Sequence, residues 1–303
     1  MMATPDSTAI LHWYAAHQRD LPWRHPEATP WAVLVSEIML QQTPVSRVLP
    51  VYTAWLGRWP TPAALAAATA GDALRAWGRL GYPRRAIRLY QTAQALVERH
   101  GGAVPASVTA LLALPGIGPY TAAAVASFAF GQRHAVLDTN VRRVLARLIS
   151  GQELPPVSAS AAERKLAESL LPEEPAVAAR WSVAVMELGA LVCTAARPQC
   201  TSCPVAGSCA WRLAGHPPGS GARRSQGYEG TDRQCRGRLL AVLRAADGPV
   251  PGSRLDAAWP GRLQRNRALD SLVADGLVDP LPGGRYALPG LAEPARPARG
   301  AAV

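Results

Sequence analysis

Apolar residues recur at helical spacing along most of the first 211 residues, and Pro and Gly interrupt them at short intervals. Apolar residues at i, i+3, i+4 and i+7 lie on one face of an α-helix, so this pattern predicts a series of short helices. Alternation typical of strands is weak in this part of the chain. The predicted helices span residues 31–40, 45–56, 61–67, 71–77, 83–99, 107–112, 119–129, 139–149, 159–170 and 175–192.

The pattern changes after residue 211. Residues 212–230 are rich in Gly, Pro, Ser and Arg and are predicted to be a linker between a core, 1–211, and a small module, 231–289. The module reads as three helices followed by two strand-like runs around the turn at 282–284. This order is typical of a winged helix, and a generic three-helix cap is the alternative. Residues 290–303 are predicted to be a disordered tail.

Composition and charge indicate a class of binding partner and a cellular location. The chain has 303 residues, 49% hydrophobic and 17% charged, which is enough to bury a sizeable core. Its net charge of +11 favours a polyanion such as nucleic acid, although an Arg-rich composition typical of a GC-rich genome is the alternative. Neither a signal peptide nor an apolar run near twenty residues is apparent, so we expect a cytoplasmic, nucleoid-associated protein that does not span membranes.

Four of the five cysteines form one motif, Cys193-x6-Cys200-x2-Cys203-x5-Cys209. Zinc sites usually pair their ligands in two close couples, and here only the middle couple is close. The longer arms fit a larger iron–sulfur cluster better. Two disulfides, or unrelated core cysteines, are the alternatives, and disulfides are disfavoured without a secretory signal. The fifth cysteine, Cys235, is expected to be an ordinary thiol.

A turn joins two predicted helices at LPGIGPYTA, residues 114–122. Gly116 and Gly118 allow a tight turn, and Pro119 suits the first position of the following helix. The free N–H groups at that helix start can bind a phosphate oxygen. The segment therefore predicts a helix-hairpin-helix that grips the DNA backbone, whereas a plain helix–helix turn is the alternative.

Two carboxylates lie where chemistry can use them. Glu37 interrupts the apolar run VLVSEIML, so we expect it to be partly buried with a raised pKa, unless it points through a polar gap to solvent. Asp138 precedes a predicted helix start. Backbone N–H groups there should keep it ionised and able to face a developing positive charge, whereas an ordinary N-cap is the alternative.

Taken together, the motifs resemble the helix-hairpin-helix DNA glycosylases that carry an iron–sulfur cluster, and most closely the MutY-type adenine DNA glycosylase family. About two thirds of the chain takes part, in the stretches LPWR, SEIMLQQTPV, LGYPRRA, LPGIGPYTA, LDTNVRRVLAR and MELGALVC. The resemblance implies a mainly α, two-lobed core with a 4Fe-4S loop at 193–209. It also implies a monomer that acts on double-stranded DNA.

The resemblance also implies roles for individual residues. Glu37 would protonate the leaving adenine and handle the water, Asp138 would stabilise the positively charged sugar, and Asn140 would support Asp138. Tyr120 stands where relatives of the endonuclease III type carry a Schiff-base lysine. The implied substrate contacts are the wedges Gln42 and Tyr82 and the walls of the adenine pocket, Arg19, Leu21, Trp23 and Arg24. The four motif cysteines would hold the cluster, with Gly116 and Gly118 on the DNA backbone.

The implied reaction is hydrolysis of the N-glycosidic bond of adenine mispaired with 8-oxoguanine or guanine. Lys165 is the only lysine and lies away from every motif, so we predict a glycosylase without lyase activity. The alternatives are a glycosylase/lyase of the endonuclease III type for oxidised pyrimidines, and a non-catalytic iron–sulfur DNA-binding protein.

The chain departs from the family pattern in several places. Pro83, Thr139 and Val183 replace common family residues, and Val183 would leave a base contact missing. The Nudix-like β-rich domain that recognises 8-oxoguanine in typical members does not fit into residues 212–303. We hypothesise that the small module contacts DNA through Arg233, Arg236 and Arg238, and a packing cap with solvated arginines is the alternative.

Overall fold

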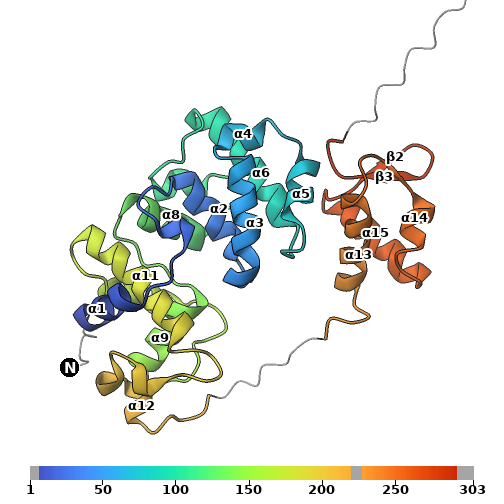
Figure 1. The fold of residues 1–303 in the computed structure, drawn as a ribbon. Helices are drawn as coiled ribbons and strands as arrows, with labels where there is room; N and C mark the ends of the chain where they lie inside the picture. Colours follow the sequence, from blue (N-terminus) through green and yellow to red (C-terminus); the bar gives the residue numbers. More distant parts are fainter. Residues whose placement is uncertain (1–6, 220–226, 292–303) are drawn as a thin grey trace, which may run out of the picture. The chain divides into compact units, whose positions relative to one another are not determined.

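The computed structural model describes residues 7–219 and 227–291, and the chain forms two compact units. The first unit comprises Met1–Glu37, Val104–Ala113 and Ile117–Arg224. The second unit comprises Ile38–Ala103, Leu114–Gly116 and Ser225–Val303. The chain first passes from one unit to the other inside α2, Pro30–Leu40, the helix that carries Glu37. Figure 1 labels this helix and the others.

Helices dominate the described part of the chain and follow the sequence prediction closely. Each of the ten predicted helices is present, with ends that differ by at most a few residues. Their bounds are α2 Pro30–Leu40, α3 Val45–Arg58, α4 Pro62–Ala66, α5 Ala70–Trp77, α6 Arg84–His100, α7 Val108–Leu112, α8 Pro119–Phe130, α9 Thr139–Leu148, α10 Ala161–Ser169 and α11 Pro175–Leu191. Short 3-10 turns at Pro22–Arg24, Cys200–Ser202 and Ala206–Ser208 and the helix α12 Ala210–Leu213 add to them.

One further helix, α1 at Ser7–His17, was not among the predicted segments. Its apolar residues are spread around the helix, so no clear amphipathic stripe marks it in the sequence. Ile10 and Tyr14, four residues apart, are nevertheless buried on one side, where α1 packs against α11. Tertiary packing therefore defines this helix better than its own pattern does.

The core of the first unit lies where α1, α9 and α11 meet. Val144 and Leu145 of α9 pack with Trp181, Val185 and other buried residues of α11. Three of the motif cysteines pack at the edge of this same cluster. The helices that carry the candidate catalytic residues are thus fixed by one hydrophobic core.

The core of the second unit is rich in tryptophan. The ring of Trp55 meets Trp59 and Trp77 edge-on, with centroid separations of 4.7 and 5.8 Å. Leu65 of α4 and Leu89 of α6 are fully buried. Helix α6 packs against both α4 and α5. Edge-to-face aromatic pairs add to the stability that burial alone provides.

The C-terminal module has the winged-helix order that the sequence predicts. Helices α13 Asp232–Arg244, α14 Gly252–Asp256 and α15 Arg262–Ala274 precede the hairpin of β2 Asp279–Leu281 and β3 Arg285–Ala287. A third strand that was not predicted, β1 Val250–Pro251, pairs with β3. The sheet is antiparallel with the order β1-β3-β2, as in winged helices.

The module belongs to the second unit, where hydrogen bonds join it to α5. Arg75 donates to the carbonyl oxygens of Arg244 and Ala246 at 3.2 and 2.8 Å, and Arg244 donates to Leu74 at 2.9 Å. The compact units therefore cut across the predicted boundary at residue 211, because the module packs with part of the helical core. The predicted tail, 290–303, lies almost entirely outside the described residues, as does the middle of the predicted linker.

No helix in the described part of the chain is long and apolar enough to cross a bilayer.

Cys235, the cysteine outside the motif, is fully buried on α13.

Candidate active site and cysteine cluster

Glu37 lies on the last turns of α2 and is buried, with 5% of its surface exposed. Its Oε2 accepts a hydrogen bond from the hydroxyl of Tyr120 at 2.9 Å. Burial raises the pKa of Glu37 to about 7, the Tyr120 hydrogen bond opposes this rise, and the charge of nearby Asp138 adds to it. The prediction of a buried carboxyl with a raised pKa is confirmed, and the alternative of a solvent-facing glutamate is wrong.

Tyr120 reaches Glu37 from the start of α8. Pro119 occupies the first turn of this helix, Gly118 is its N-cap, and no side chain caps this end. The pKa of the Tyr120 phenol is raised well above its usual value by burial and by the neighbouring carboxylates, so the phenol stays protonated and donates to Glu37.

Asp138 is the N-cap of α9. Its Oδ1 accepts from the Val141 N–H at 2.6 Å, and its Oδ2 accepts from Nδ2 of Asn140 at 2.7 Å. Both carboxylate oxygens are therefore hydrogen-bonded. Burial raises the pKa of Asp138, and the bonds from Val141 and Asn140 oppose that rise. That Asp138 is ionised stays a prediction.

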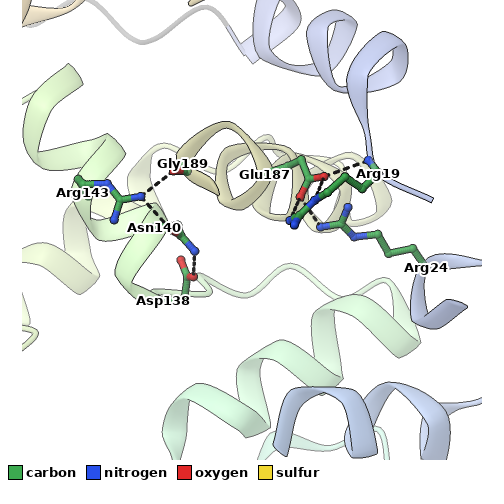
Figure 2. A network of polar contacts seen from close by, with 7 residues as sticks. All are labelled: Arg19, Arg24, Asp138, Asn140, Arg143, Glu187 and Gly189. Atoms are coloured by element: carbon green, nitrogen blue, oxygen red, sulfur yellow. Dashed lines mark hydrogen bonds and ion pairs between the residues drawn. The ribbon is translucent and has the colours of Figure 1, made fainter. Parts of the chain in front are cut away.

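A buried arginine, Arg143, extends the Asp138 network to Gly189 of α11 (Figure 2). Arg143 donates from Nη2 to Oδ1 of Asn140 at 2.8 Å and to the carbonyl of Gly189 at 2.6 Å. Its Nε donates to the carbonyl of Cys193 at 2.7 Å. Asn140 thus has a fixed amide orientation, with its NH₂ group on Asp138, which confirms the predicted supporting contact.

Glu187 organises the second polar cluster of Figure 2, and it was not among the predicted site residues. It is completely buried on α11 and accepts from Nε and Nη2 of Arg19 at 2.8 and 2.7 Å and from Nη2 of Arg24 at 2.8 Å. Burial alone would raise the pKa of Glu187, but the bonds from both arginines lower it to about 2. A single carboxylate in the apolar run 181–192 is the signal that could have identified it.

Val183 precedes Glu187 by one helical turn on the same helix. Val183 was expected to leave a contact with the base missing. In the structure, Val183 packs against the hydrophobic core. A carboxylate is present four residues later instead. The other predicted wall residues, Leu21 and Trp23, are 5% and 8% exposed. Trp23 lies within the 3-10 turn Pro22–Arg24, and Leu21 is its N-cap.

The two candidate wedges belong to the second unit. Gln42 and Tyr82 are both exposed, Tyr82 by 54%, and each has a positive φ, 57° and 46°. Left-handed backbone is uncommon for residues other than glycine and persists where surrounding contacts hold it.

The hairpin glycines differ from each other. Gly116 has φ 76°, and a Cβ there would lie 2.7 Å from Cβ of Arg88. Gly118 has a negative φ of −97°, and a Cβ there would meet nothing within 4 Å. The fold therefore requires glycine only at 116, and the open space at Gly118 lies at the uncapped start of α8.

The four motif cysteines are free thiols that line one hollow, which is partly open to solvent. The predicted alternative of two disulfides is therefore absent from this structure. No group of three or more His, Cys, Asp or Glu side chains in the described ranges is close enough to hold a single metal ion.

Positive charge surrounds this hollow. Arg147 is 1% exposed, donates to Sγ of Cys193 at 3.4 Å and to the carbonyl of Thr194 at 2.7 Å, and lies 4.6 Å from the ring of Trp211. Burial and the neighbouring thiols raise the pKa of Cys203 to about 11.

Comparisons with known proteins agree with this geometry. Residues 35–171 match the HhH-GPD superfamily of base excision DNA repair proteins. Over 287 residues the chain is 54% identical to the adenine DNA glycosylase of Mycobacterium tuberculosis, covering 93% of both chains. It is 52% identical over 290 residues to the adenine DNA glycosylase of Mycolicibacterium smegmatis, covering 95% of this chain and 98% of the relative.

A solved thermostable thymine-DNA glycosylase matches with a TM-score of 0.60 and 27% identity, covering 69% of this chain and 95% of its own. The fold is thus shared by enzymes named for different bases, whereas the near full-length identities are to one kind. The chain belongs to the adenine DNA glycosylase family of the HhH-GPD base excision repair superfamily.

Proposed function

We propose that this protein hydrolyses the N-glycosidic bond of adenine mispaired with 8-oxoguanine or guanine in duplex DNA, without lyase activity. The observation that carries the proposal is the buried Glu37 carboxyl, whose pKa of about 7 lets it hold a proton near neutral pH. A carboxyl of this kind is what release of a poor leaving group needs.

Glu37 is the general acid. Adenine leaves poorly as an anion, so Glu37 gives its proton to a ring nitrogen of adenine as the bond between C1′ and N9 breaks. The electron pair of that bond stays with the protonated base, and positive charge remains on the sugar. The Glu37 carboxylate then takes a proton from the attacking water, whose oxygen bonds to C1′, and the enzyme regains its starting protonation state.

Asp138 is the group that faces the positive sugar. When two neighbouring buried carboxyl groups share one proton, the proton resides on the group that accepts fewer hydrogen bonds. Glu37 accepts from Tyr120, whereas Asp138 accepts from both Val141 and Asn140. The charge therefore resides on Asp138, where it stabilises the oxocarbenium-like transition state.

Arg19, Arg24 and Glu187 form a preset wall of the adenine pocket. Nη1 of Arg24 is buried and has no hydrogen-bond partner among the described residues, which leaves a donor for a bound base. Glu187 holds both arginines by ion pairs of 2.7 and 2.8 Å, so little ordering remains when the base enters. Leu21 and Trp23 complete the apolar side of this wall.

Lys165, the only lysine of the chain, is exposed on α10, and Tyr120 occupies the place of a lyase lysine. The site therefore has no lysine amine that could form an imine with the sugar. Borohydride should not trap the protein on its substrate, and efficient trapping would favour the endonuclease III alternative.

Cys193, Cys200, Cys203 and Cys209 would hold a 4Fe-4S cluster, which fits the spacing of the motif and the lining of the hollow by Arg147 and Arg212. The cluster would supply structure, and the proposed reaction does not pass through it. Purified protein should contain about four irons and lose them with its fold when a cysteine is replaced.

The C-terminal module is proposed to take part in DNA binding and in discrimination of 8-oxoguanine. Arg236 pairs with Asp275 at 2.5 Å, so its charge is used inside the module. Arg233 and Arg238 are exposed and remain the candidates on α13. Deletion of residues 231–303 should lower the preference for adenine opposite 8-oxoguanine, and unchanged preference with retained folding would refute a lesion-reading role.

The decisive assay uses the whole protein and a duplex with one adenine opposite 8-oxoguanine, followed by alkali to cut the abasic site. Strand cleavage should require alkali. Glu37→Gln should bind this duplex and leave it intact. Cleavage that survives in Glu37→Gln would contradict the mechanism, and no base release by the wild type would favour a non-catalytic DNA-binding protein.

We further propose that the protein acts as a monomer in the cytoplasm, at the nucleoid.

A further inference from the structure

Arg85, the second residue of α6, ends in a buried guanidinium that gathers the chain segment after α2. Its Nη1 donates to the carbonyl oxygens of Ile38 and Met39, both at 2.9 Å, and also to Gln41. Its Nη2 donates to Oγ1 of Thr43 at 2.9 Å. The last carbonyls of a helix lack partners inside the helix, so Arg85 both caps α2 and holds the loop that follows it.

The same guanidinium also holds a second loop. Nη2 donates to the carbonyl of Gly81 at 3.2 Å, and the guanidinium lies 5.4 Å from the ring centre of Tyr82 and 5.2 Å from that of Trp77. The hydroxyl of Thr43 donates across to the carbonyl of Leu80 at 3.3 Å. One side chain therefore ties the two loops to each other.

These two loops carry the proposed wedges in unusual backbone conformations. Among the described residues other than glycine, only Gln42, Tyr82 and His216 have a positive φ. Gln42 lies between two residues that Arg85 contacts, and Tyr82 follows a third. A left-handed backbone at an exposed polar or aromatic residue relaxes unless neighbouring contacts hold it, and here the contacts converge on Arg85.

Direct binding of DNA does not explain Arg85. The residue is 7% exposed, and its hydrogen bonds point into the protein. Burial and the charge of Arg47 lower the pKa of Arg85 to about 10, yet the group remains charged at neutral pH. A guanidinium has five donors in a fixed fork, which lysine lacks, so it can serve several carbonyl oxygens at once.

We propose that Arg85 is a positioning residue that holds Gln42 and Tyr82 ready as a pair, so that both enter the duplex together when adenine leaves the stack. This inference rests on the proposed function and on the wedge role that the resemblance to the adenine DNA glycosylases implies for Gln42 and Tyr82. A base can leave the stack only if the gap is filled, and side chains that are already ordered lose less freedom on entering. Arg85 acts through the loops and touches neither substrate nor reacting atoms.

The test compares Arg85→Met and Arg85→Lys with the wild type. Arg99→Met, at the exposed end of the same helix, is the control. Hydrogen exchange of the free proteins should rise at least tenfold in peptides covering residues 41–43 and 80–82 in both Arg85 variants. Exchange in peptides covering 30–37 and 139–148 should stay unchanged, which separates loop release from general unfolding.

The second measurement uses a duplex with adenine opposite 8-oxoguanine and 2-aminopurine beside the adenine. At saturating protein, the fluorescence rise on unstacking should fall at least threefold in both Arg85 variants, and the single-turnover rate should fall at least tenfold. The Kd for the duplex should change less than threefold, because Arg85 does not touch DNA. Arg99→Met should behave as the wild type in every measurement.

Unchanged exchange in the two loops would overturn the proposal, as would full unstacking by Arg85→Met or rescue by Arg85→Lys. A wild type that unstacks the duplex but releases no adenine would refute the proposed function and leave the positioning role supported. A wild type that unstacks nothing would refute the role of the wedges and therefore this inference.

Discussion

The hydroxyl of Tyr120 donates to Oε2 of Glu37 over 2.9 Å, which places a neutral donor beside a buried carboxyl. Burial raises the pKa of Glu37 to about 7, and the hydrogen bond opposes this rise because it favours the ionised form. In the proposed mechanism, Tyr120 therefore tunes the proton donor without taking part in bond breaking.

This pairing predicts a particular pH dependence. The reaction needs protonated Glu37, so the single-turnover rate should be level below pH 7 and fall about tenfold per pH unit well above it. Tyr120→Phe removes a contact that lowers the pKa of Glu37, so the falling limb should move to higher pH. Tyr90→Phe, whose hydroxyl accepts from Gln94 at an exposed position, should leave it in place. Rates measured from pH 5 to 9 decide this, and an unmoved limb in Tyr120→Phe would count against the assignment.

Asp138→Asn should separate catalysis from folding. Asn caps helices about as well as Asp, so the Val141 N–H keeps its acceptor. Nδ2 of Asn140 loses its acceptor, so the free energy of unfolding should fall by about 1–3 kcal/mol while the protein stays folded. The charge opposite the sugar is lost, and single-turnover excision should fall by about 10²–10³ with duplex binding retained. A variant with near-normal excision would leave Asp138 as an N-cap only.

Glu187→Gln should cost stability in a pH-dependent way. The folded-state pKa of Glu187, about 2, lies below its ordinary value of 4.5, so its contribution is fully present above about pH 4.5 and is lost as the pH falls towards 2. We expect unfolding free energy to fall by about 2–3 kcal/mol at pH 7. The difference from the wild type should shrink in denaturant titrations at pH 4 and below. A difference independent of pH would indicate a loss of packing only.

Gly189→Ala should disturb the Asn140 support of Asp138. A Cβ at position 189 would lie 2.7 Å from Cβ of Asn140 and 2.9 Å from its carbonyl oxygen. Helices α9 and α11 must move apart, which should cost about 1–3 kcal/mol and reduce excision. Gly57→Ala is the matched control: it lies within α3, has nothing within 4 Å of its Cβ, and should be neutral or stabilising by up to about 1 kcal/mol. Equal behaviour of both variants would contradict the predicted clash.

Cys203→Ser should remove iron, lower thermal stability and weaken duplex binding. The single-turnover rate of the fraction that still binds should change little, because the cluster loop does not touch the reacting atoms. Cys235→Ala, in the C-terminal module, should keep its full iron content. Iron analysis, thermal melting and a binding titration measure these effects, and a normal iron content in Cys203→Ser would remove it from the ligand set.

Much of the site follows from local sequence signals. The apolar run around Glu37 forced that carboxyl to be buried, and the polar start of α9 made Asp138 an N-cap. The winged-helix order of the module was likewise visible, because helix and turn signals are local. The two-residue strand β1 was not, because so short a strand exists only through its pairing with β3.

The sequence by itself determined which groups can do chemistry: one buried acid, one capped aspartate, four clustered thiols and no lysine near them. Only the tertiary structure decided how those groups are tuned and held. Glu187 meets Arg19 across 168 residues, and Arg85 meets Ile38 across 47, so no local pattern could reveal either contact. Burial outweighed the hydrogen bonds at Asp138 for the same reason: desolvation depends on everything that packs around a group, and neighbouring residues in the chain supply only part of it.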